Sequence, residues 1–139
     1  MTRSSSSSLL LWQTAGLFLV RITVGFFMIY HGLEILSAEK MNGYLQWDLF
    51  KNSSSAKTMV YAGKAAELAG GILLAIGLLT RIAALILMGT MSYIAFFVGK
   101  GIIWYDDQHP FLFVLLAIVF LSIGGGPWSL DHLLFKKRN

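Results

Sequence analysis

Residues 82–99 read IAALILMGTMSYIAFFVG and carry no charged side chain. A second uncharged stretch, residues 110–130, follows after a short polar segment. The two stretches contain 18 and 21 residues. About 20 helical residues are needed to cross the ~30 Å hydrocarbon core of a bilayer. These two stretches alone therefore indicate a membrane protein.

The composition of the whole chain agrees with this interpretation. The 139 residues fit one compact unit, of which 56% are hydrophobic and 13% are charged, about half the charged share of a soluble domain. The chain has no cysteine, which excludes disulfides and Cys-ligated clusters. Its net charge of +4 includes the cluster Lys136-Lys137-Arg138, a pattern that favours an anionic membrane surface over nucleic acid. The sequence contains no phosphate-binding loop, zinc spacing or nucleic-acid motif.

The pattern of apolar segments predicts an all-α polytopic membrane protein, a bundle of four transmembrane helices with both termini cytoplasmic. We expect a flexible tail at residues 1–8, a membrane domain at 9–128 and a short basic interfacial helix at 129–139. The predicted spans are 10–36, 61–79, 81–99 and 109–125, with an outer loop at 37–60 that includes a short interfacial helix around 41–50. A secretory signal peptide at the N-terminus is the competing interpretation, but that apolar region is too long and contains Arg21.

The orientation follows from the positive-inside rule. The side that holds both termini carries Arg3, Arg81 and the C-terminal basic cluster against one acidic residue, Asp131. The opposite side carries as many acidic residues as lysines. The bias is modest and predicts that both termini face the cytoplasm.

Two charged residues occur deep inside the predicted spans. Arg21 lies 11 residues after Leu10, roughly 16 Å from the inner end of its helix. Glu67 lies 12 residues before Leu79, roughly 18 Å from the same side. An unpaired charge near the bilayer centre costs at least ~2.5–3.5 kcal/mol, so both should face the bundle interior. Their opposite charge and similar depth predict an Arg21–Glu67 ion pair.

This predicted pair has two interpretations. In the first it only fixes which helices pack and in which register. In the second it forms the polar floor of a cavity or handles protons. Lys64 lies three residues from Glu67, where it either competes with Arg21 or extends outward. Small residues share the faces of the two charges and predict close helix contact: Gly25, Gly32, Gly63 and Gly71.

A second set of polar residues lies at the outer ends of the predicted spans. Its members are His31, Glu34, Tyr61, Lys64, Asp106, Asp107 and His109. They are either ordinary head-group residues or ligands for a quinol head group. A divalent metal is disfavoured because the ligands come from three unlinked segments, and haem is disfavoured because no histidine pair brackets the core. We therefore predict no intrinsic cofactor and no metal, and quinone as the candidate ligand.

Three motifs in this order resemble the DoxX family of small four-helix bacterial membrane proteins. They are LVRITVGF at 19–26 followed by His31-Gly32, ELAGG at 67–71 followed by GLLTR at 77–81, and GGGPWSLD at 124–131. The resemblance covers roughly residues 12 to 134. It implies a four-helix bundle in the bacterial cytoplasmic (inner) membrane. It also assigns Arg21, Glu67, Arg81, Ser129 and Asp131 to the characteristic polar positions of the family.

Relatives in that family include a subunit of a thiosulfate:quinone oxidoreductase and proteins linked to oxidative stress. The resemblance therefore implies a membrane subunit associated with an oxidoreductase and the quinone pool. In this interpretation Arg81 and Asp131 organise the inner face where a soluble or membrane redox partner docks. The interpretation is also compatible with a homo-oligomer. The alternatives are a small transport or efflux protein and a structural assembly factor without chemistry of its own. The outer loop and the stretch at 106–109 depart from the family pattern.

Overall fold

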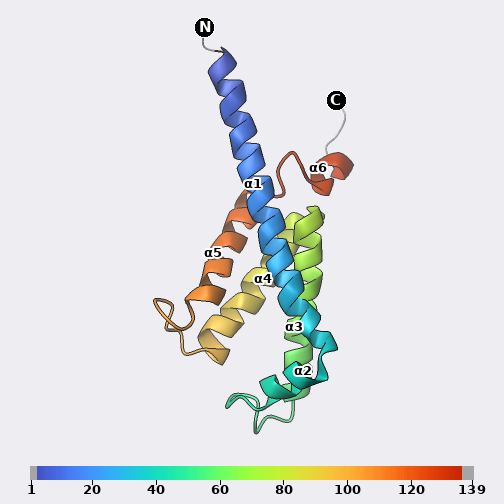
Figure 1. Cartoon of the computed structure of the whole chain (residues 1–139), viewed down its shortest axis with the longest axis vertical. Coiled ribbons are helices and arrows are strands. Elements are labelled where there is room, and N and C mark those ends of the chain that lie inside the picture. Colours follow the sequence, from blue (N-terminus) through green and yellow to red (C-terminus); the bar gives the residue numbers. More distant parts are fainter. Residues whose placement is uncertain (1–2, 136–139) are drawn as a thin grey trace.

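The computed structural model describes residues 3–135, which form only helices and their connections (Figure 1). The long helices are α1 (Arg3–Gly32), α3 (Ala56–Ile76), α4 (Thr80–Tyr93) and α5 (Gln108–Ile123). The shorter elements are a 3₁₀ turn η1 (Leu33–Leu36), α2 (Ala38–Leu45), a π-helical turn η2 (Ile94–Val98) and α6 (Leu130–Phe135). The predicted all-α class is confirmed.

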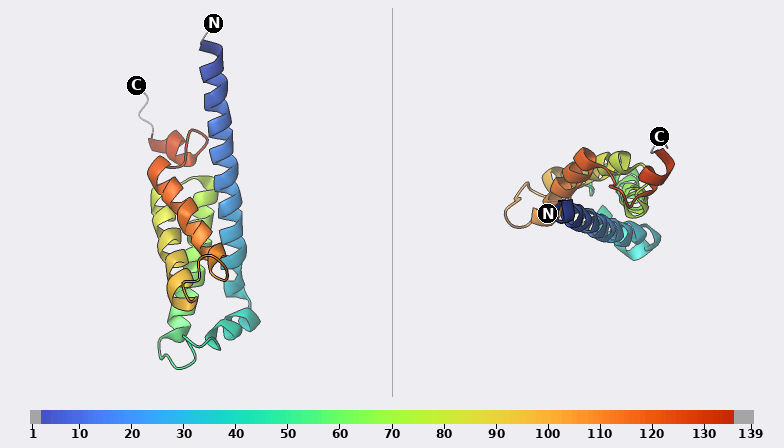
Figure 2. Two further views of the ribbon diagram at one scale, coloured as in Figure 1. Left: turned by 90° about the vertical axis from the view of Figure 1, so that its left-hand side faces the viewer. Right: turned by 90° about the horizontal axis from the view of Figure 1, so that it is seen from above.

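The four long helices pack side by side in one bundle (Figure 2). Three segments are long and apolar enough to cross a membrane: Ser8–Leu36, Ala56–Ile76 and Thr80–Val98. The fourth, α5, is apolar but has only 16 residues, or roughly 24 Å of helix. The described chain begins and ends at the same end of the bundle, because α6 lies beside the N-terminal half of α1 (Figures 1 and 2).

Helices α1 and α3 run antiparallel in direct contact because both carry glycine at the crossing. A Cβ on Gly25 would lie 2.7 Å from the backbone nitrogen of Ala75, and one on Gly32 would lie 2.4 Å from that of Leu68. A Cβ on Gly71 would meet α1 at 2.8 Å. The predicted close contact is therefore confirmed at these three glycines. Gly63 has no atom within 4 Å of such a Cβ, so the prediction was wrong there.

An apolar core fills the space between the helices. Its most deeply buried members come from all four long helices: Met28, Leu74, Ala83, Ala84, Leu87, Ala117 and Phe120. Large apolar side chains such as Trp12, Phe26 and Leu133 are exposed on the outside of the molecule. An outer surface this apolar is typical of a protein that contacts lipid.

Some boundaries differ from the sequence prediction. Helix α1 begins at Arg3, so the described part of the predicted tail is helical, since extending an existing helix costs little. The short helix predicted around 41–50 is present as α2 but begins and ends earlier, and the last residues of the predicted loop form the first turn of α3. Helix α3 ends at Gly77, whose positive φ of 72° suits a residue without a Cβ. The chain then enters α4 after only Leu78 and Leu79.

Candidate functional site

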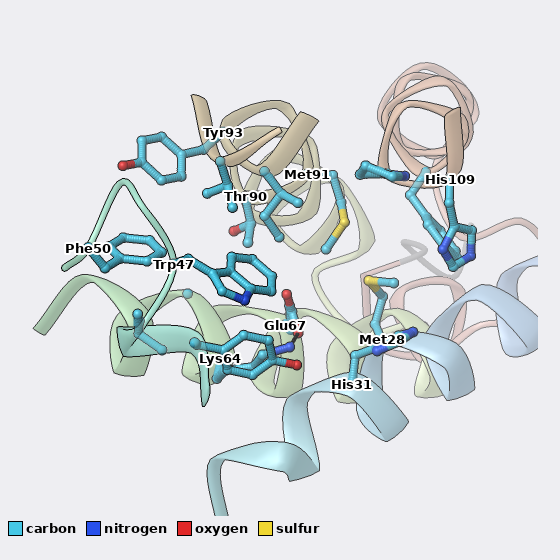
Figure 3. Close-up of a pocket in the computed structure, with 17 residues that line it drawn as sticks. Met28, His31, Trp47, Phe50, Lys64, Glu67, Thr90, Met91, Tyr93 and His109 are labelled. Atoms are coloured by element: carbon cyan, nitrogen blue, oxygen red, sulfur yellow. Dashed lines mark hydrogen bonds and ion pairs between the residues drawn. The ribbon is translucent and has the colours of Figure 1, made fainter. Parts of the chain in front are cut away.

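A cavity of about 210 Å³ lies at the end of the bundle where α2 packs (Figure 3). It is bordered by α1, α3, α4 and α5, and by α2 and the turn that follows it. Most of its lining is aliphatic or aromatic. The side chains in the lining that carry a charge, an imidazole or a hydroxyl are His31, Tyr44, Lys64, Glu67, Thr90, Tyr93 and His109. The arrangement combines an apolar pocket with a few polar groups, as is common in small-molecule sites.

Glu67 is the buried charge of this cavity. Its side chain is 3% exposed and points into the cavity from α3 (Figure 3). The Lys64 ammonium lies 2.9 Å from its Oε2 and also 2.9 Å from Oε2 of Glu34. A buried ion pair in the spans is thus confirmed, but its cation is Lys64. One lysine therefore bridges a buried carboxylate and a less deeply buried one.

Local structure explains why these three residues meet. Lys64 and Glu67 are three residues apart on α3, so they share one helical face. Glu34 lies in the 3₁₀ turn η1, where α1 ends next to the N-terminal half of α3. The stem of Lys64 lies along apolar surface, and its ammonium lies 4.8 Å from the centre of the Tyr44 ring. The sequence predicted proximity to Glu67 but not the bridge.

The network continues from Glu34 to the surface of α2. Lys40 Nζ lies 2.8 Å from Glu34 Oε1, and the Tyr44 hydroxyl donates a hydrogen bond to Glu34 Oε2. The hydrogen bond to Glu34 raises the pKa of Lys40 above its ordinary value. Burial and the hydrogen bond to Glu34 raise the pKa of Tyr44, so its hydroxyl stays protonated. The two lysines and two glutamates of the network balance in charge.

The two histidines predicted for the outer end also meet at the cavity. The rings of His31 on α1 and His109 on α5 are 6.2 Å apart, and His109 contacts Phe113. Asp106 is exposed and is absent from the cavity lining, so the structure does not bring it to the others. Its neighbour Asp107 is buried and accepts hydrogen bonds from the backbone N–H groups of Lys100 and Ile102. Asp107 therefore shapes the loop before α5.

Sequence reasoning missed the contribution of the outer loop to the cavity. Tyr44, Trp47 and Phe50 all line it, as does Thr90 from α4. The loop is held in place because Met41 and Phe50 pack with Ala56 and Val60 in a second apolar cluster. Aromatic and apolar residues spaced three apart, at positions 41, 44, 47 and 50, were the available signal. That spacing indicates one apolar helical face and not an irregular loop.

The predicted Arg21–Glu67 ion pair is wrong. Arg21 is 1% exposed, as expected for a residue that faces the interior. Its Nη1 donates to the carbonyl oxygens of Leu74 at 2.7 Å and Ala75 at 2.8 Å, and its Nη2 donates to Trp128 O at 2.6 Å. The guanidinium thus binds the C-terminal end of α3, where carbonyl groups lack helical partners and attract a cation.

The error arose from the assumed depth of α1. The contacts of Gly25 with Ala75 and of Gly32 with Leu68 set a register in which Glu67 lies opposite residue 33. Arg21 is 12 residues away from that position, or roughly 18 Å along the helix. The prediction took residue 10 as the inner end of the span. Helix α1, however, extends past the rest of the bundle (Figure 1).

The three candidate residues at the inner end of the bundle, Arg81, Ser129 and Asp131, have different surroundings. Both carboxylate oxygens of Asp131 accept backbone N–H groups at the start of α4, from Leu79 at 2.6 Å and Thr80 at 2.8 Å. Burial raises the pKa of Asp131, but the bonds from Thr80 and Leu79 and the charge of Arg21 outweigh it and lower the pKa below its ordinary value. Ser129 is buried and donates to Gly126 O at 2.6 Å. Arg81 is exposed.

Comparisons with known proteins agree with the three motifs. A model of the DoxX family matches residues 16–100. An uncharacterized protein of Haemophilus influenzae is 31% identical over 128 residues, covering 85% of this chain and 90% of that protein. No solved structure matches the chain. Among the described residues, no group of three or more His, Cys, Asp or Glu side chains is arranged to hold a metal ion.

Proposed function

This chain belongs to the DoxX family of membrane proteins, and from that premise we propose that it is the membrane subunit of an oxidoreductase, binding a quinone or quinol ring beside Glu67. The observation that carries the proposal is a nearly buried carboxylate that faces an apolar cavity lined by aromatic rings (Figure 3). A carboxylate accepts a hydrogen bond from a ring hydroxyl. The ammonium of Lys64 beside it donates to a ring carbonyl.

The charge balance of the site favours a neutral ligand. A carboxylate among aromatic rings also suits an organic cation, which would support the transport alternative. Here, however, Lys64 already supplies the positive charge between Glu67 and Glu34. A second cation would meet an ammonium at the same carboxylate. A neutral ring with polar oxygens avoids this repulsion and still uses both charges as hydrogen-bond partners.

The size of the cavity favours a head group and not a whole lipid-like molecule. Its volume of about 210 Å³ is below the ~300–1,000 Å³ of typical small-molecule sites. A single substituted ring fits this space, and an isoprenoid tail would remain in the lipid around the bundle. The outer surface next to the cavity is apolar, with Phe97 and Phe27 exposed. Such a surface is compatible with a tail that lies in lipid.

The proposal also includes a location and a partner. We expect the protein in the bacterial cytoplasmic membrane with both termini inside. The chain has no cysteine, so its own side chains offer no thiol couple and the electrons come from a partner protein. The inner face around Asp131 and the exposed Arg81 is the candidate docking surface for that partner, and the basic cluster at 136–138 lies outside the described residues.

A binding experiment with two probes tests the role of Glu67. Decylubiquinone and decylubiquinol are titrated into the purified protein in detergent, and binding is followed by quenching of tryptophan fluorescence, which Trp47 in the cavity should dominate. Only the quinol donates a hydrogen bond to a carboxylate. Glu67→Gln should therefore weaken quinol binding roughly tenfold or more, as expected for loss of a charge-assisted hydrogen bond, and quinone binding much less.

Two controls make this result specific. Trp47→Phe should remove most of the quenching without abolishing binding, which is then measured by equilibrium dialysis. Glu39→Gln changes an exposed glutamate on α2 and should leave both affinities unchanged. Absence of binding by either probe to the wild-type protein, together with tight binding of tetraphenylphosphonium, would contradict the proposal and favour a cation transporter.

A further inference from the structure

We propose that Lys64 and Glu34 form a proton path that connects the cavity-facing Glu67 with the outer surface only. The inference rests on the proposed function for its purpose, because reduction of a quinone by electrons from the partner consumes protons that must reach the site. The path itself is carried by contacts between charged side chains, which begin at the cavity lining. It adds a direction to the site: protons exchanged at Glu67 come from, or go to, the side of the membrane where α2 lies.

The contacts form an unbroken chain from a buried carboxylate, through Lys64 and Glu34 with 12% and 11% exposed side chains, to a half-exposed lysine. Glu67 is 3% exposed and Lys64 is 12% exposed, and they are joined by a contact of 2.9 Å. Lys64 joins Glu34 at 2.9 Å, and Glu34 joins Lys40 at 2.8 Å, where Lys40 is 49% exposed. Each distance is within the range of a hydrogen bond that can transfer a proton. A proton on Glu67 is passed on when Lys64 gives one of its protons to Glu34 and accepts the proton of Glu67.

The opposite direction is closed by apolar packing and by a fixed charge. Between Glu67 and the inner end of the bundle lie the buried side chains of Val24, Met28 and Leu74. Beyond them lies Arg21, whose guanidinium is bound to backbone carbonyl groups. A fixed positive charge in a narrow, dry interior is a barrier to protons. Exchange at Glu67 is therefore expected from one side.

Other titratable groups that face Glu67 are located on the same side of it. They are His31 from α1, Tyr44 from α2, Tyr93 from α4 and His109 from α5, and all of them line the cavity. The two histidines offer a second exit at the cavity mouth. Only Lys64, however, directly contacts Glu67 among the ion pairs of the described residues. Lys64 is therefore the residue whose replacement distinguishes the path from a purely structural ion pair.

The test uses reaction of Glu67 with dicyclohexylcarbodiimide, which adds to protonated carboxyl groups and leaves a mass label. The full-length protein is reconstituted in lipid vesicles, and a C-terminal affinity tag separates the two orientations. The medium on one side is then acidified rapidly, and labelled Glu67 is quantified over time by peptide mass spectrometry. In the wild-type protein, acid on the α2 side should increase the labelling rate severalfold, and acid on the side of the termini should not.

The decisive variant is Lys64→Arg. Arginine preserves the positive charge and both ion pairs, but a guanidinium does not release a proton in proteins. The response of Glu67 to acid on the α2 side should therefore become several times slower, although the protein stays folded by circular dichroism. Lys57→Arg, at an exposed position in the first turn of α3, is the matched control and should behave as wild type.

Each other outcome overturns the inference. A Lys64→Arg protein that responds as fast as wild type makes Lys64 only a structural counter-ion. An outward path is excluded if the labelling rate of Glu67 rises after acidification on the side of the termini. It is also excluded if acidification on neither side changes that rate. Because no ring ligand is present, this result is separate from the quinol titration. If the protein fails to bind quinol but the labelling rate of Glu67 still responds to acid on the α2 side, the proposed ligand is wrong and the proton path stands.

Discussion

At the scale of single residues, Arg21 is held in place by burial and by its hydrogen bonds. It is almost completely buried and donates hydrogen bonds to three carbonyl groups that belong to the end of α3 and to Trp128. The first two carbonyls lie in the last turn of their helix, where a cation also interacts favourably with the helix dipole. Arg21 therefore links α1, α3 and the segment before α6.

Replacing Arg21 should lower the free energy of unfolding of the protein. Arg21→Met removes all three hydrogen bonds, each made by a charged donor and worth about 1.5–3 kcal/mol, although Leu74 O keeps the N–H of Gly77 as a donor. We expect a loss of unfolding free energy of at least about 3 kcal/mol, measured by titration with sodium dodecyl sulfate in mixed micelles and circular dichroism. Arg81→Met, at an exposed arginine, should change it by less than about 0.5 kcal/mol. Equal effects of the two variants would contradict this account.

The sequence predicted the burial of Arg21 and Glu67 correctly, because charges in apolar spans must face the interior. It failed on their partners, because the depth of a charge depends on helix register. That register is set by the contacts of Gly25 and Gly32 with α3. Counting residues from the end of an apolar segment does not reveal these contacts. The sequence predicted that Lys64 either competes with Arg21 for Glu67 or extends outward, and helical spacing places Lys64 and Glu67 on one face.

At the scale of helices, the bundle is held by the close contact of α1 with α3. A methyl group on Gly32 would come within 2.6 Å of three atoms of Leu68, two of which are backbone atoms that cannot move without shifting α3. Gly32→Ala should therefore force the helices apart and destabilise the protein by about 1–3 kcal/mol, as overpacking does. The same detergent titration measures this change.

Gly89 provides the matched comparison for that variant. A Cβ at this position of α4 meets no atom within 4 Å, so Gly89→Ala should stabilise the helix by up to about 1 kcal/mol. Opposite signs at the two glycines are the expected result. Destabilisation of similar size at both positions would show that helix contact is not the cause at Gly32.

The start of α4 depends on a residue from another element. Asp131 accepts the N–H groups of Leu79 and Thr80 and so acts as the cap that α4 lacks in its own sequence. Its pKa in the folded protein lies below the ordinary value of 3.8. The carboxylate therefore stabilises the fold above about that pH, and this stabilisation is lost as the pH falls through the lowered pKa.

Asp131→Asn should consequently reduce the unfolding free energy at neutral pH by about 1 kcal/mol, the usual value of a cap. The difference from wild type should shrink as the pH falls below the folded-state pKa, since both proteins then carry an uncharged group. Unfolding titrations across the acid range measure this convergence. Asp106→Asn, at an exposed aspartate, should show no difference at any pH. A constant difference between Asp131→Asn and wild type would contradict the pKa argument.

At the scale of the whole molecule, the two ends of the bundle differ in character. One end holds the cavity with its charged network, and the other is closed by Arg21, Asp131 and α6. The sequence predicted the fold class and the long apolar helices, because these depend on composition and length. A cavity with a polar floor was one interpretation of the buried charges, but its lining by the outer loop was not predicted, because Tyr44, Trp47 and Phe50 come from a segment of polar composition.

The predicted topology assigns these ends to opposite sides of the membrane. The chain contains no cysteine, so single-cysteine variants need no further changes. Ser54→Cys and Asp106→Cys, both at exposed positions near the cavity end, should react with a membrane-impermeant maleimide in intact cells. Leu133→Cys on α6 should react only after the membrane is opened. Reaction of Leu133→Cys in intact cells would reverse the orientation.

The central claim is that the cavity holds a quinone or quinol, and the most direct measurement is the quinone content of the protein from its native membrane. The protein is extracted in mild detergent, and bound quinone is quantified by mass spectrometry next to a Thr90→Phe variant, whose ring fills the cavity from α4. The account predicts about one quinone per wild-type chain and far less in the folded variant. Equal traces in both proteins would contradict it.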